Sequence, residues 1–284
     1  MTADPETPSA PRIIDVWMQQ PTAQFLAHDM FATLRRWTKR DVDERLTDIS
    51  ATVEAMDRAG VAAGLLSAWC SPKEWLITND DVAAAVRAYP GRFAGLASVD
   101  LSRPMEAVRE LRRCVEQLGF KGLRIVPWLW NLPPDDRRCY PLYAACVDLD
   151  VAFCLQVGHT GPLYPSEFGR PIPYVDRVAL EFPELRIVGG HIGFPWTNEM
   201  VSLATKYPNV YIDTSAYVPT RYPRDLVDYM RGHGSRKVLF GTNYPMLSPA
   251  RCVGEVDVLE LSDEQRSDFL SGNAARVFKL TEQV

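Results

Sequence analysis

The chain has 284 residues, of which 46% are hydrophobic and 24% are charged, a composition typical of a soluble globular protein with ample material for a core. Its formal net charge of −5 at pH 7 leaves no basic excess to neutralise phosphates, which argues against nucleic acid and anionic membranes as partners. No run of residues approaches the ~18 apolar positions of a membrane span, so we expect no membrane partner and favour a small-molecule ligand.

The six cysteines are scattered without a C-x-x-C pair, and the chain starts with the polar, proline-rich stretch MTADPETPSAPR. The cysteine pattern predicts buried, reduced thiols in a cytoplasmic protein rather than a redox motif or a zinc cluster. The polar start predicts a disordered lead over residues 1–12 rather than a signal peptide, which leaves residues 13–284 as one domain.

From residue 13 onward, apolar strands alternate with amphipathic helices. Three helices end in an aromatic residue followed by proline, at Pro90, Pro183 and Pro208, and an apolar strand follows each at once. We predict strands over residues 13–17, 62–67, 93–99, 122–126, 151–157, 185–191, 210–214 and 237–242. The predicted helices are 43–59, 79–89, 104–118, 140–149, 172–182, 197–207 and 223–232, with two short helices at the end, the first opened by a capping box of Ser262 and Gln265.

Several of these strands are apolar on both faces, as in a parallel sheet covered by helices. Eight strand–helix units in about 270 residues favour a single (β/α)8 TIM-type barrel, an α/β fold, over a doubly wound open sheet. No linker rich in Gly, Ser or Pro divides the chain, and we interpret the proline-rich segment 127–134 as a long loop over one barrel end.

In such a barrel the working residues lie at the carboxyl ends of the strands. Two of the four histidines, His159 and His191, fall there. At the first strand, IIDVWMQQP places Trp17 and Gln19 at alternate positions, so their side chains point the same way.

The segments IIDVW, AYPGRFAGLASV, KGLRI, QVGHTG, VGGHIGFPW, NVYIDTSA, LFGTNYP and SGNAARVF follow one another between Ile13 and Leu280. In order and spacing they resemble the amidohydrolase superfamily, specifically the amidohydrolase-related branch that includes aminocarboxymuconate-semialdehyde decarboxylase and other decarboxylases, hydratases and lactonases. The resemblance implies a small-molecule enzyme on a (β/α)8 barrel, with a homodimer as a plausible assembly.

The family pattern implies an H-x-H metal pair on the first strand, a further ligand histidine after the fifth, an acid/base histidine after the sixth and an aspartate after the eighth. His159 matches the fifth-strand ligand, and His191 matches the sixth-strand histidine. Trp17, Gln19 and Asn243 stand where the histidine pair and the aspartate would be, so three of the four expected metal ligands are replaced. Because catalytic zinc takes three N, O or S ligands, we expect no cofactor, with a weak divalent metal on His159 and His191 as the alternative.

Loss of the metal narrows the chemistry. Zinc lowers the pKa of bound water from about 15.7 to about 7, on the order of 12 kcal/mol of activation, whereas one histidine base contributes roughly 10²- to 10⁴-fold. We therefore expect an activated ester, a lactone or a β-keto acid as substrate rather than an unactivated amide.

Arg124 ends the fourth strand, where a buried guanidinium needs an anionic partner. Its partner is either a protein carboxylate, with Asp15, Asp100 and Asp213 as candidates, or the carboxylate of a substrate. The sequence leaves both open.

Aromatic residues gather at the strand ends and predict a mostly apolar pocket for a planar or ring-shaped, acidic ligand. The alternative is a purely structural role, in which the aromatic residues pack long loops against the barrel. The candidate substrate-binding residues are Trp17, Gln19, Arg124, Trp128, Trp196, Tyr217 and Asn243; Trp69 and Trp130 also fall near strand ends.

We predict a metal-independent hydrolase or lyase in which His191 is the general acid/base and Asp213 or His159 orients it. A binding protein that has lost catalysis is the second hypothesis; it predicts that His191 and Gln19 are engaged by protein groups. A metal-dependent amidohydrolase or decarboxylase with substitute ligands is the third.

Overall fold

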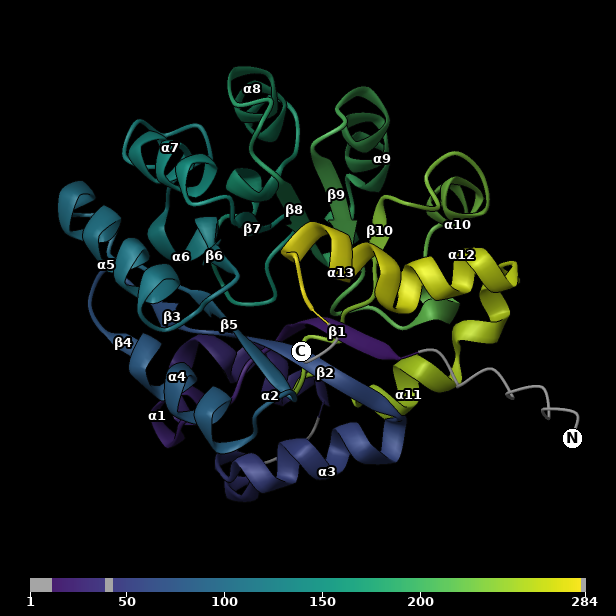
Figure 1. Cartoon of the computed structure of the whole chain (residues 1–284), viewed down its shortest axis with the longest axis horizontal. Helices are drawn as coiled ribbons and strands as arrows, with labels where there is room; N and C mark the ends of the chain where they lie inside the picture. Colours follow the sequence, from purple (N-terminus) through teal and green to yellow (C-terminus); the bar gives the residue numbers. More distant parts are fainter. Residues whose placement is uncertain (1–11, 39–42, 282–284) are drawn as a thin grey trace, which may run out of the picture.

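The computed structural model describes residues 12–38 and 43–281, so nearly all of the predicted disordered lead lies outside the described residues. Eight parallel strands form one sheet in the order β1-β2-β5-β6-β7-β8-β9-β10 (Figure 1). The strands are β1 (Ile13–Met18), β2 (Val61–Ser67), β5 (Phe93–Ala97), β6 (Gly122–Ile125), β7 (Ala152–Gln156), β8 (Ile187–Gly190), β9 (Val210–Asp213) and β10 (Val238–Leu239).

Backbone hydrogen bonds join the first strand to the last. The amide of Val16 donates to the carbonyl of Phe240 at 3.0 Å, and the amide of Asn243 donates to the carbonyl of Trp17 at 2.8 Å. The carboxylate of Asp15 also accepts from the amide and hydroxyl of Thr242. These contacts close the sheet, and the predicted (β/α)8 barrel is confirmed.

Seven long helices surround the barrel (Figure 1). They are α3 (Ile49–Ala59), α4 (Asn79–Ala88), α5 (Pro104–Glu116), α7 (Tyr140–Asp148), α8 (Tyr174–Glu181), α9 (Thr197–Lys206) and α10 (Arg224–Arg231). The aromatic residues before Pro90, Pro183 and Pro208 are the C-caps of α4, α8 and α9, as their sequence pattern predicts. The predicted helix 43–59 is divided at Asp48, whose side chain caps α3 by accepting from the amide of Ser50 at 2.9 Å.

Additional short elements lie in the connections. After β1 come α1 (Ala23–Ala27), η1 (Asp29–Phe31), α2 (Ala32–Thr38) and η2 (Glu44–Thr47); after β2 comes a hairpin of β3 (Trp69–Cys70) and β4 (Trp75–Ile77); and the segment predicted as a loop after β6 contains α6 (Pro127–Trp130). The later connections contain η3 (Glu167–Gly169), η4 (His191–Gly193), η5 (Pro219–Arg221), α11 (Pro249–Gly254), η6 (Val256–Leu259), α12 (Asp263–Ser267), η7 (Asp268–Gly272) and α13 (Asn273–Phe278).

The core has two layers. One packs the helices against the outside of the sheet, and the other fills the barrel interior with residues such as Val16, Leu65 and Val188. Val277 and Phe278 of α13 belong to the interior layer, and α13 crosses the centre of the ring in Figure 1. This helix therefore covers one end of the barrel and leaves the carboxyl ends of the strands for the site.

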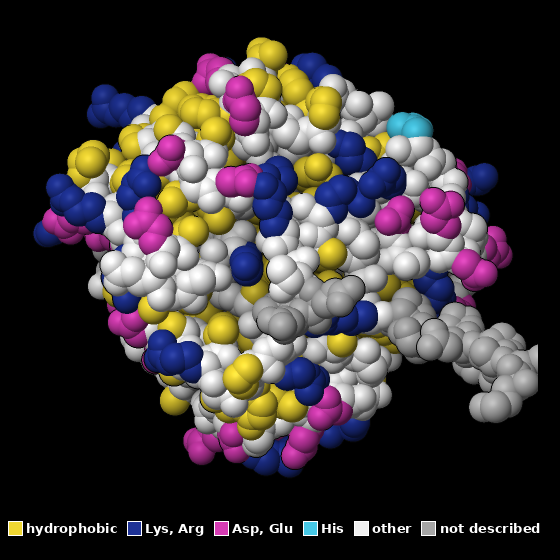
Figure 2. Space-filling model, viewed as in Figure 1, with side chains coloured by type: hydrophobic (Ala, Val, Ile, Leu, Met, Phe, Trp, Pro, Cys, Tyr) yellow, Lys and Arg dark blue, Asp and Glu magenta, His cyan; other side chains and the backbone are white. Residues whose placement is uncertain are grey.

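Charged side chains of both signs lie on the surface, whereas the cysteines lie in the interior. On the face drawn in Figure 2, basic and acidic side chains are interspersed and no large patch has a single sign. All six cysteines are buried and none forms a disulfide. Across residues 12–38 and 43–281, no helix combines the length and the apolar character that crossing a membrane requires.

Candidate functional site

Trp17, at the end of β1, lies in the middle of the candidate site. Its side chain is 2% exposed, and its ring centroid lies 5.4 Å from that of His191. A Cβ atom on Gly190 would lie 2.5 Å from this indole, so the end of β8 needs glycine to make room for it. The indole thus forms an apolar wall at a position that the resemblance matches to one histidine of an H-x-H motif.

Arg124 of β6 is stacked between two indoles. Its Cζ lies 4.6 Å from the centroid of the Trp17 ring and 5.2 Å from that of Trp69, and its Nη2 donates to Oε1 of Gln19 at 3.1 Å. The side chain is buried, yet within the described residues Nε and Nη1 have no acceptor.

No carboxylate of the described residues lies within 4.0 Å of the Arg124 guanidinium, so the ion pair with Asp15, Asp100 or Asp213 is not formed. Burial lowers the pKa of Arg124 to about 9, and the neighbouring Cys154 and Asp213 oppose that shift. The group is still a cation at neutral pH. Of the two partners left open by the sequence, an anionic ligand therefore remains.

Gln19 is held entirely by protein groups. Its Nε2 donates to the carbonyl of Tyr244 at 2.6 Å and to Oδ1 of Asn243 at 3.1 Å, while its Oε1 accepts from Arg124. Asn243 has a left-handed backbone with a φ of 63°. The two amides therefore bond to each other, and Gln19 in turn positions Arg124; substrate binding by Gln19 and Asn243 stays a prediction.

His191 follows β8 with a φ of 67° and is buried. Its Nδ1 lies 2.7 Å from Oγ of Ser215, and within the described part of the chain Nε2 has no hydrogen-bonding partner. Burial, and then the charge of Arg124, lower the pKa of His191 to about 3. The ring is therefore neutral, with Nδ1 fixed by Ser215 and Nε2 unpaired within the described residues.

Asp213, at the end of β9, acts on His191 through Ser215 rather than directly. Its Oδ2 accepts from the Ser215 hydroxyl, from the Ser215 amide at 3.2 Å and from the His191 amide at 3.4 Å. Burial raises the pKa of Asp213 to about 7. Asp213, one of the two residues predicted to orient His191, is thus linked to its imidazole by an Asp213–Ser215–His191 chain. The role of Ser215 was not predicted, although its spacing of two residues from Asp213 places both on one side of an extended segment.

The remaining predicted site residues are divided between the two sides of this centre. His159 packs on Phe194 with ring centroids 5.8 Å apart, and Phe194 lies 5.7 Å from Tyr217, whose pKa burial raises to about 12. Trp128 lies 6.5 Å from Trp69 on the side of Arg124. Trp196 is the N-cap residue of α9, and its side chain forms no ring contact or hydrogen bond with the described residues of this centre.

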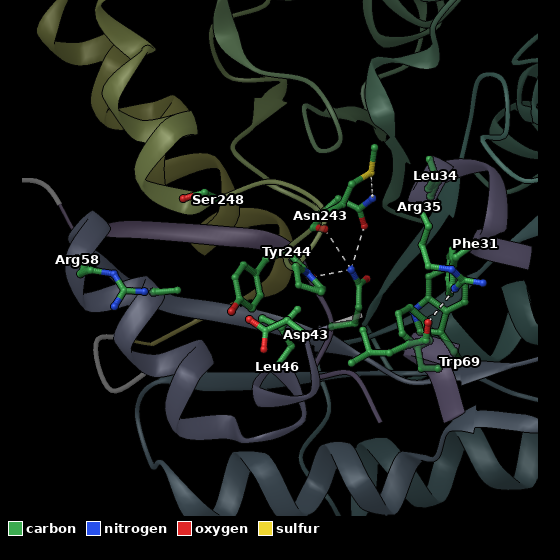
Figure 3. A pocket seen from close by; sticks show the side chains of 16 residues that line it. Phe31, Leu34, Arg35, Asp43, Leu46, Arg58, Trp69, Asn243, Tyr244 and Ser248 are labelled. Atoms are coloured by element: carbon green, nitrogen blue, oxygen red, sulfur yellow. Dashed lines mark hydrogen bonds between the residues drawn. The ribbon is translucent and has the colours of Figure 1, made fainter. Parts of the chain in front are cut away.

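A cavity of about 670 Å³ lies beside this centre, between the connection after β1 and the connection after β10 (Figure 3). Gln19, Trp69 and Asn243 line it together with apolar side chains such as Phe25 and Phe31. Gln19 and Trp69 also contact Arg124, so these two side chains separate the cavity from the buried guanidinium.

The donor set does not fit a divalent metal of the kind that the family pattern implies. Among residues 12–38 and 43–281, no three or more His, Cys, Asp or Glu side chains gather in a geometry that could hold a metal ion. Gln19, which the resemblance matches to one H-x-H position, accepts a hydrogen bond from the guanidinium of Arg124, so a positive charge lies next to it.

Comparison with known sequences finds one matching family model and several decarboxylases that are similar to this chain. A family model described as Amidohydrolase matches residues 34–280. Gamma-resorcylate decarboxylase of Polaromonas sp. is 28% identical over 252 residues, which cover 71% of this chain and 75% of that protein. The 2-amino-3-carboxymuconate-6-semialdehyde decarboxylase of Dictyostelium discoideum is 26% identical over 286 residues, which cover 83% of this chain and 77% of that protein.

Solved structures share the fold. An uncharacterised TIM-barrel protein of Bordetella bronchiseptica superposes with a TM-score of 0.83 at 26% identity, covering 94% of this chain and 98% of that chain. A dihydroxybenzoic acid decarboxylase of Polaromonas sp. JS666, with bound manganese and 2-nitroresorcinol, has a TM-score of 0.68 at 22% identity, covering 97% and 99%.

These relatives confirm the expected resemblance to decarboxylases and the expected enzyme class of an amidohydrolase-superfamily hydrolase or carboxy-lyase. Because the family model spans most of the sequence, the chain belongs to the amidohydrolase family.

Proposed function

We propose that this protein is a carboxy-lyase that removes carbon dioxide from a small, planar, acidic molecule without a metal ion. Arg124 supplies the positive charge and His191 carries the proton. The observation that carries the proposal is the guanidinium of Arg124, which is buried between Trp17 and Trp69 with Nε and Nη1 unpaired in the described structure.

A buried cation without a counterion supports an anionic substrate. Removing a charge from water costs several kcal/mol, and a protein recovers part of that cost when an anion binds. Two indole faces enclose the guanidinium, so a flat acid suits the space better than a branched one. The decarboxylases among the relatives support the same class, since gamma-resorcylate is itself a small aromatic acid.

A cation held in a fixed position also favours decarboxylation, because negative charge develops as the carbon–carbon bond breaks. In a phenolic acid the ring carbon first gains a proton, which turns the neighbouring oxygen into a carbonyl; in a β-keto acid that carbonyl is already present. The bond to the carboxylate then breaks, carbon dioxide leaves, and the electron pair moves onto the carbonyl oxygen. A buried guanidinium held in place by Gln19 stabilises that arriving charge without reorganisation. The same cation would polarise the carbonyl of a lactone or activated ester, but the relatives favour the lyase.

The Asp213–Ser215–His191 chain prepares the imidazole for proton transfer. While Asp213 is a carboxylate, the Ser215 hydroxyl donates to it and therefore accepts from Nδ1–H of His191. That arrangement leaves a lone pair on Nε2, which can take a proton from a substrate hydroxyl or from water. Nε2 then gives this proton to the carbon atom that loses carbon dioxide. When the carboxyl carries the proton, the chain reverses and Nε2–H becomes a donor.

Independence from metal is part of the proposal, although a related decarboxylase structure contains manganese. Manganese prefers carboxylate, carbonyl and water ligands. Here Trp17 and Gln19 take two ligand positions of the family pattern, and Arg124 brings a positive charge to Gln19. No step of the proposed reaction passes through a metal.

The test compares wild-type protein with Arg124→Met and His191→Asn. Asparagine suits the left-handed backbone at position 191, and Arg103→Met, on an exposed arginine, is the matched control. Each protein is incubated with 2,6-dihydroxybenzoate and with 2-hydroxybenzoate, and the released carbon dioxide is measured. We expect turnover by wild-type and control protein, and a loss of roughly 10²-fold or more in both site variants.

Metal content is measured by mass spectrometry on the same samples. Activity that requires one equivalent of manganese or zinc would overturn the metal-independent part alone. Binding without turnover, lost in Arg124→Met, would support a binding protein, the alternative that the engaged Gln19 favours. Turnover that survives Arg124→Met would contradict the assignment of the cation.

A further inference from the structure

Two indole N–H groups next to Arg124 lack an acceptor. Nε1 of Trp69 and Nε1 of Trp128 are enclosed, and neither has a hydrogen-bonding partner among the described residues. Their side chains are 7% and 3% exposed. A buried donor left unpaired costs free energy, so two of them beside an unpaired guanidinium require an explanation.

The two indoles are held firmly and lie together. Trp69 comes from β3, directly after β2, and Trp128 comes from α6, directly after β6. Their ring centroids are 6.5 Å apart in an edge-on arrangement. Phe25 packs on Trp69 at 5.1 Å and Tyr164 packs on Trp128 at 5.4 Å, so neither ring is free to turn toward another acceptor.

The surroundings contain donors in excess of acceptors. Nε and Nη1 of Arg124 are unpaired as well, and the guanidinium lies 5.2 Å from the Trp69 ring. Trp69 also lines the 670 Å³ cavity, so one of the two indoles lies between that cavity and the guanidinium (Figure 3). A ligand that satisfies them must be flat, anionic and equipped with at least two acceptor oxygens.

We propose that Trp69 and Trp128 select substrates with an oxygen next to the carboxylate. Their N–H groups donate to a hydroxyl, phenolate or keto oxygen, while Arg124 binds the anionic group. The inference rests on the proposed function and names its substrate class as 2-hydroxyaryl or β-keto acids. That oxygen also receives the electron pair when carbon dioxide leaves, so the same donors that recognise it become stronger partners as the charge arrives.

Calorimetric titration of three probes tests this inference. The probes are 2,6-dihydroxybenzoate, 2-hydroxybenzoate and benzoate, and the variants are Trp69→Phe and Trp128→Phe, which keep an aromatic ring but remove the N–H. Trp130→Phe, on the same short helix as Trp128, is the control because its N–H is not among the unpaired donors.

We expect each of the two variants to weaken binding of the hydroxylated probes by about tenfold and to change benzoate binding by less than about twofold. Equal losses for all three probes would mean that the indoles only pack, and the inference would be wrong while the role of Arg124 stood. Unchanged benzoate binding in Arg124→Met would instead overturn the proposed function. If wild-type protein bound none of the probes, both would fail.

Discussion

At the scale of single residues, Ser215 links the two titratable groups Asp213 and His191. It stands between a buried carboxyl and a buried imidazole that do not touch, and its hydroxyl can donate to only one of them at a time. The hydroxyl therefore couples the protonation of Asp213 to the identity of the nitrogen that carries the proton in His191. A methyl group in its place would leave both groups buried but uncoupled.

Ser215→Ala should therefore lower kcat by about 10- to 100-fold with little change in KM, because the imidazole loses its fixed tautomer. The pH profile of kcat/KM should also shift, which a merely structural role would not cause. Thr214→Val removes the neighbouring buried hydroxyl, which donates to the carbonyl of Leu239, and serves as the control. If both variants lose the same activity with unchanged pH profiles, Ser215 does not position His191.

At this scale the sequence predicts which residues lie at the strand ends but not which side chains bond to one another. Family position indicated His159, His191 and the substitutions at Trp17 and Gln19, because these depend on local order along the chain. Whether Arg124 meets a carboxylate depends on distances of a few ångströms between strands, which no local pattern records. The structure places Asp213 near enough to interact electrostatically with Arg124 but not to pair with it.

At the scale of elements, the residues at the end of β8 are small because a large side chain from β1 packs against them. β8 ends in two glycines, and the second, Gly190, lies against the indole that comes from β1. The arrangement lets Trp17 reach across the barrel to both Arg124 and His191. The packing of one strand end thus fixes the positions of the two groups that carry the proposed chemistry.

Gly190→Ala should destabilise the protein by about 1–3 kcal/mol, since the new methyl group overlaps a fully packed indole. The free energy of unfolding in urea measures this effect. Gly254→Ala is the matched control, because a Cβ atom there meets nothing within 4 Å. Equal stability of the two variants would show that Trp17 yields easily and does not fix the site.

Elements with strong local signals were predictable, and those held by distant contacts were not. The proline-terminated helices and the apolar strands appear close to their predicted limits. The helices between residues 23 and 38 lack a periodic pattern and depend on partners such as Trp69, against which Phe25 and Phe31 pack. β10 is shorter than predicted, at Val238–Leu239, because Phe240 instead bonds to β1 and to Phe269.

At the scale of the whole molecule, the barrel depends on how its first and last strands meet. Asp15 links them, since its carboxylate accepts from Thr242 while it also accepts from the amide of Trp17 at 3.1 Å. Burial nevertheless raises the pKa of Asp15 from 3.8 to about 7, so ionisation is costly in the folded state. Closure of the fold is therefore sensitive to pH.

Stability should fall as the pH rises from about 4 to about 7. In this range the unfolded chain has released the Asp15 proton while the folded chain keeps it, a difference on the order of a few kcal/mol. Asp15→Asn keeps an acceptor for the amides and cannot ionise, so its unfolding free energy should depend less steeply on pH between 5 and 7. An identical slope in wild-type and variant urea titrations would mean that Asp15 does not titrate in this range.

The stacking of Arg124 on two indoles also makes tryptophan fluorescence sensitive to the charge at the site. The emission of an indole depends on the electric field across its ring, and the guanidinium applies such a field to Trp17 and Trp69 from 4.6 and 5.2 Å. An acid that neutralises the guanidinium changes that field. Ligand binding can therefore be followed by the intrinsic fluorescence of the unlabelled protein, including for compounds that are never turned over.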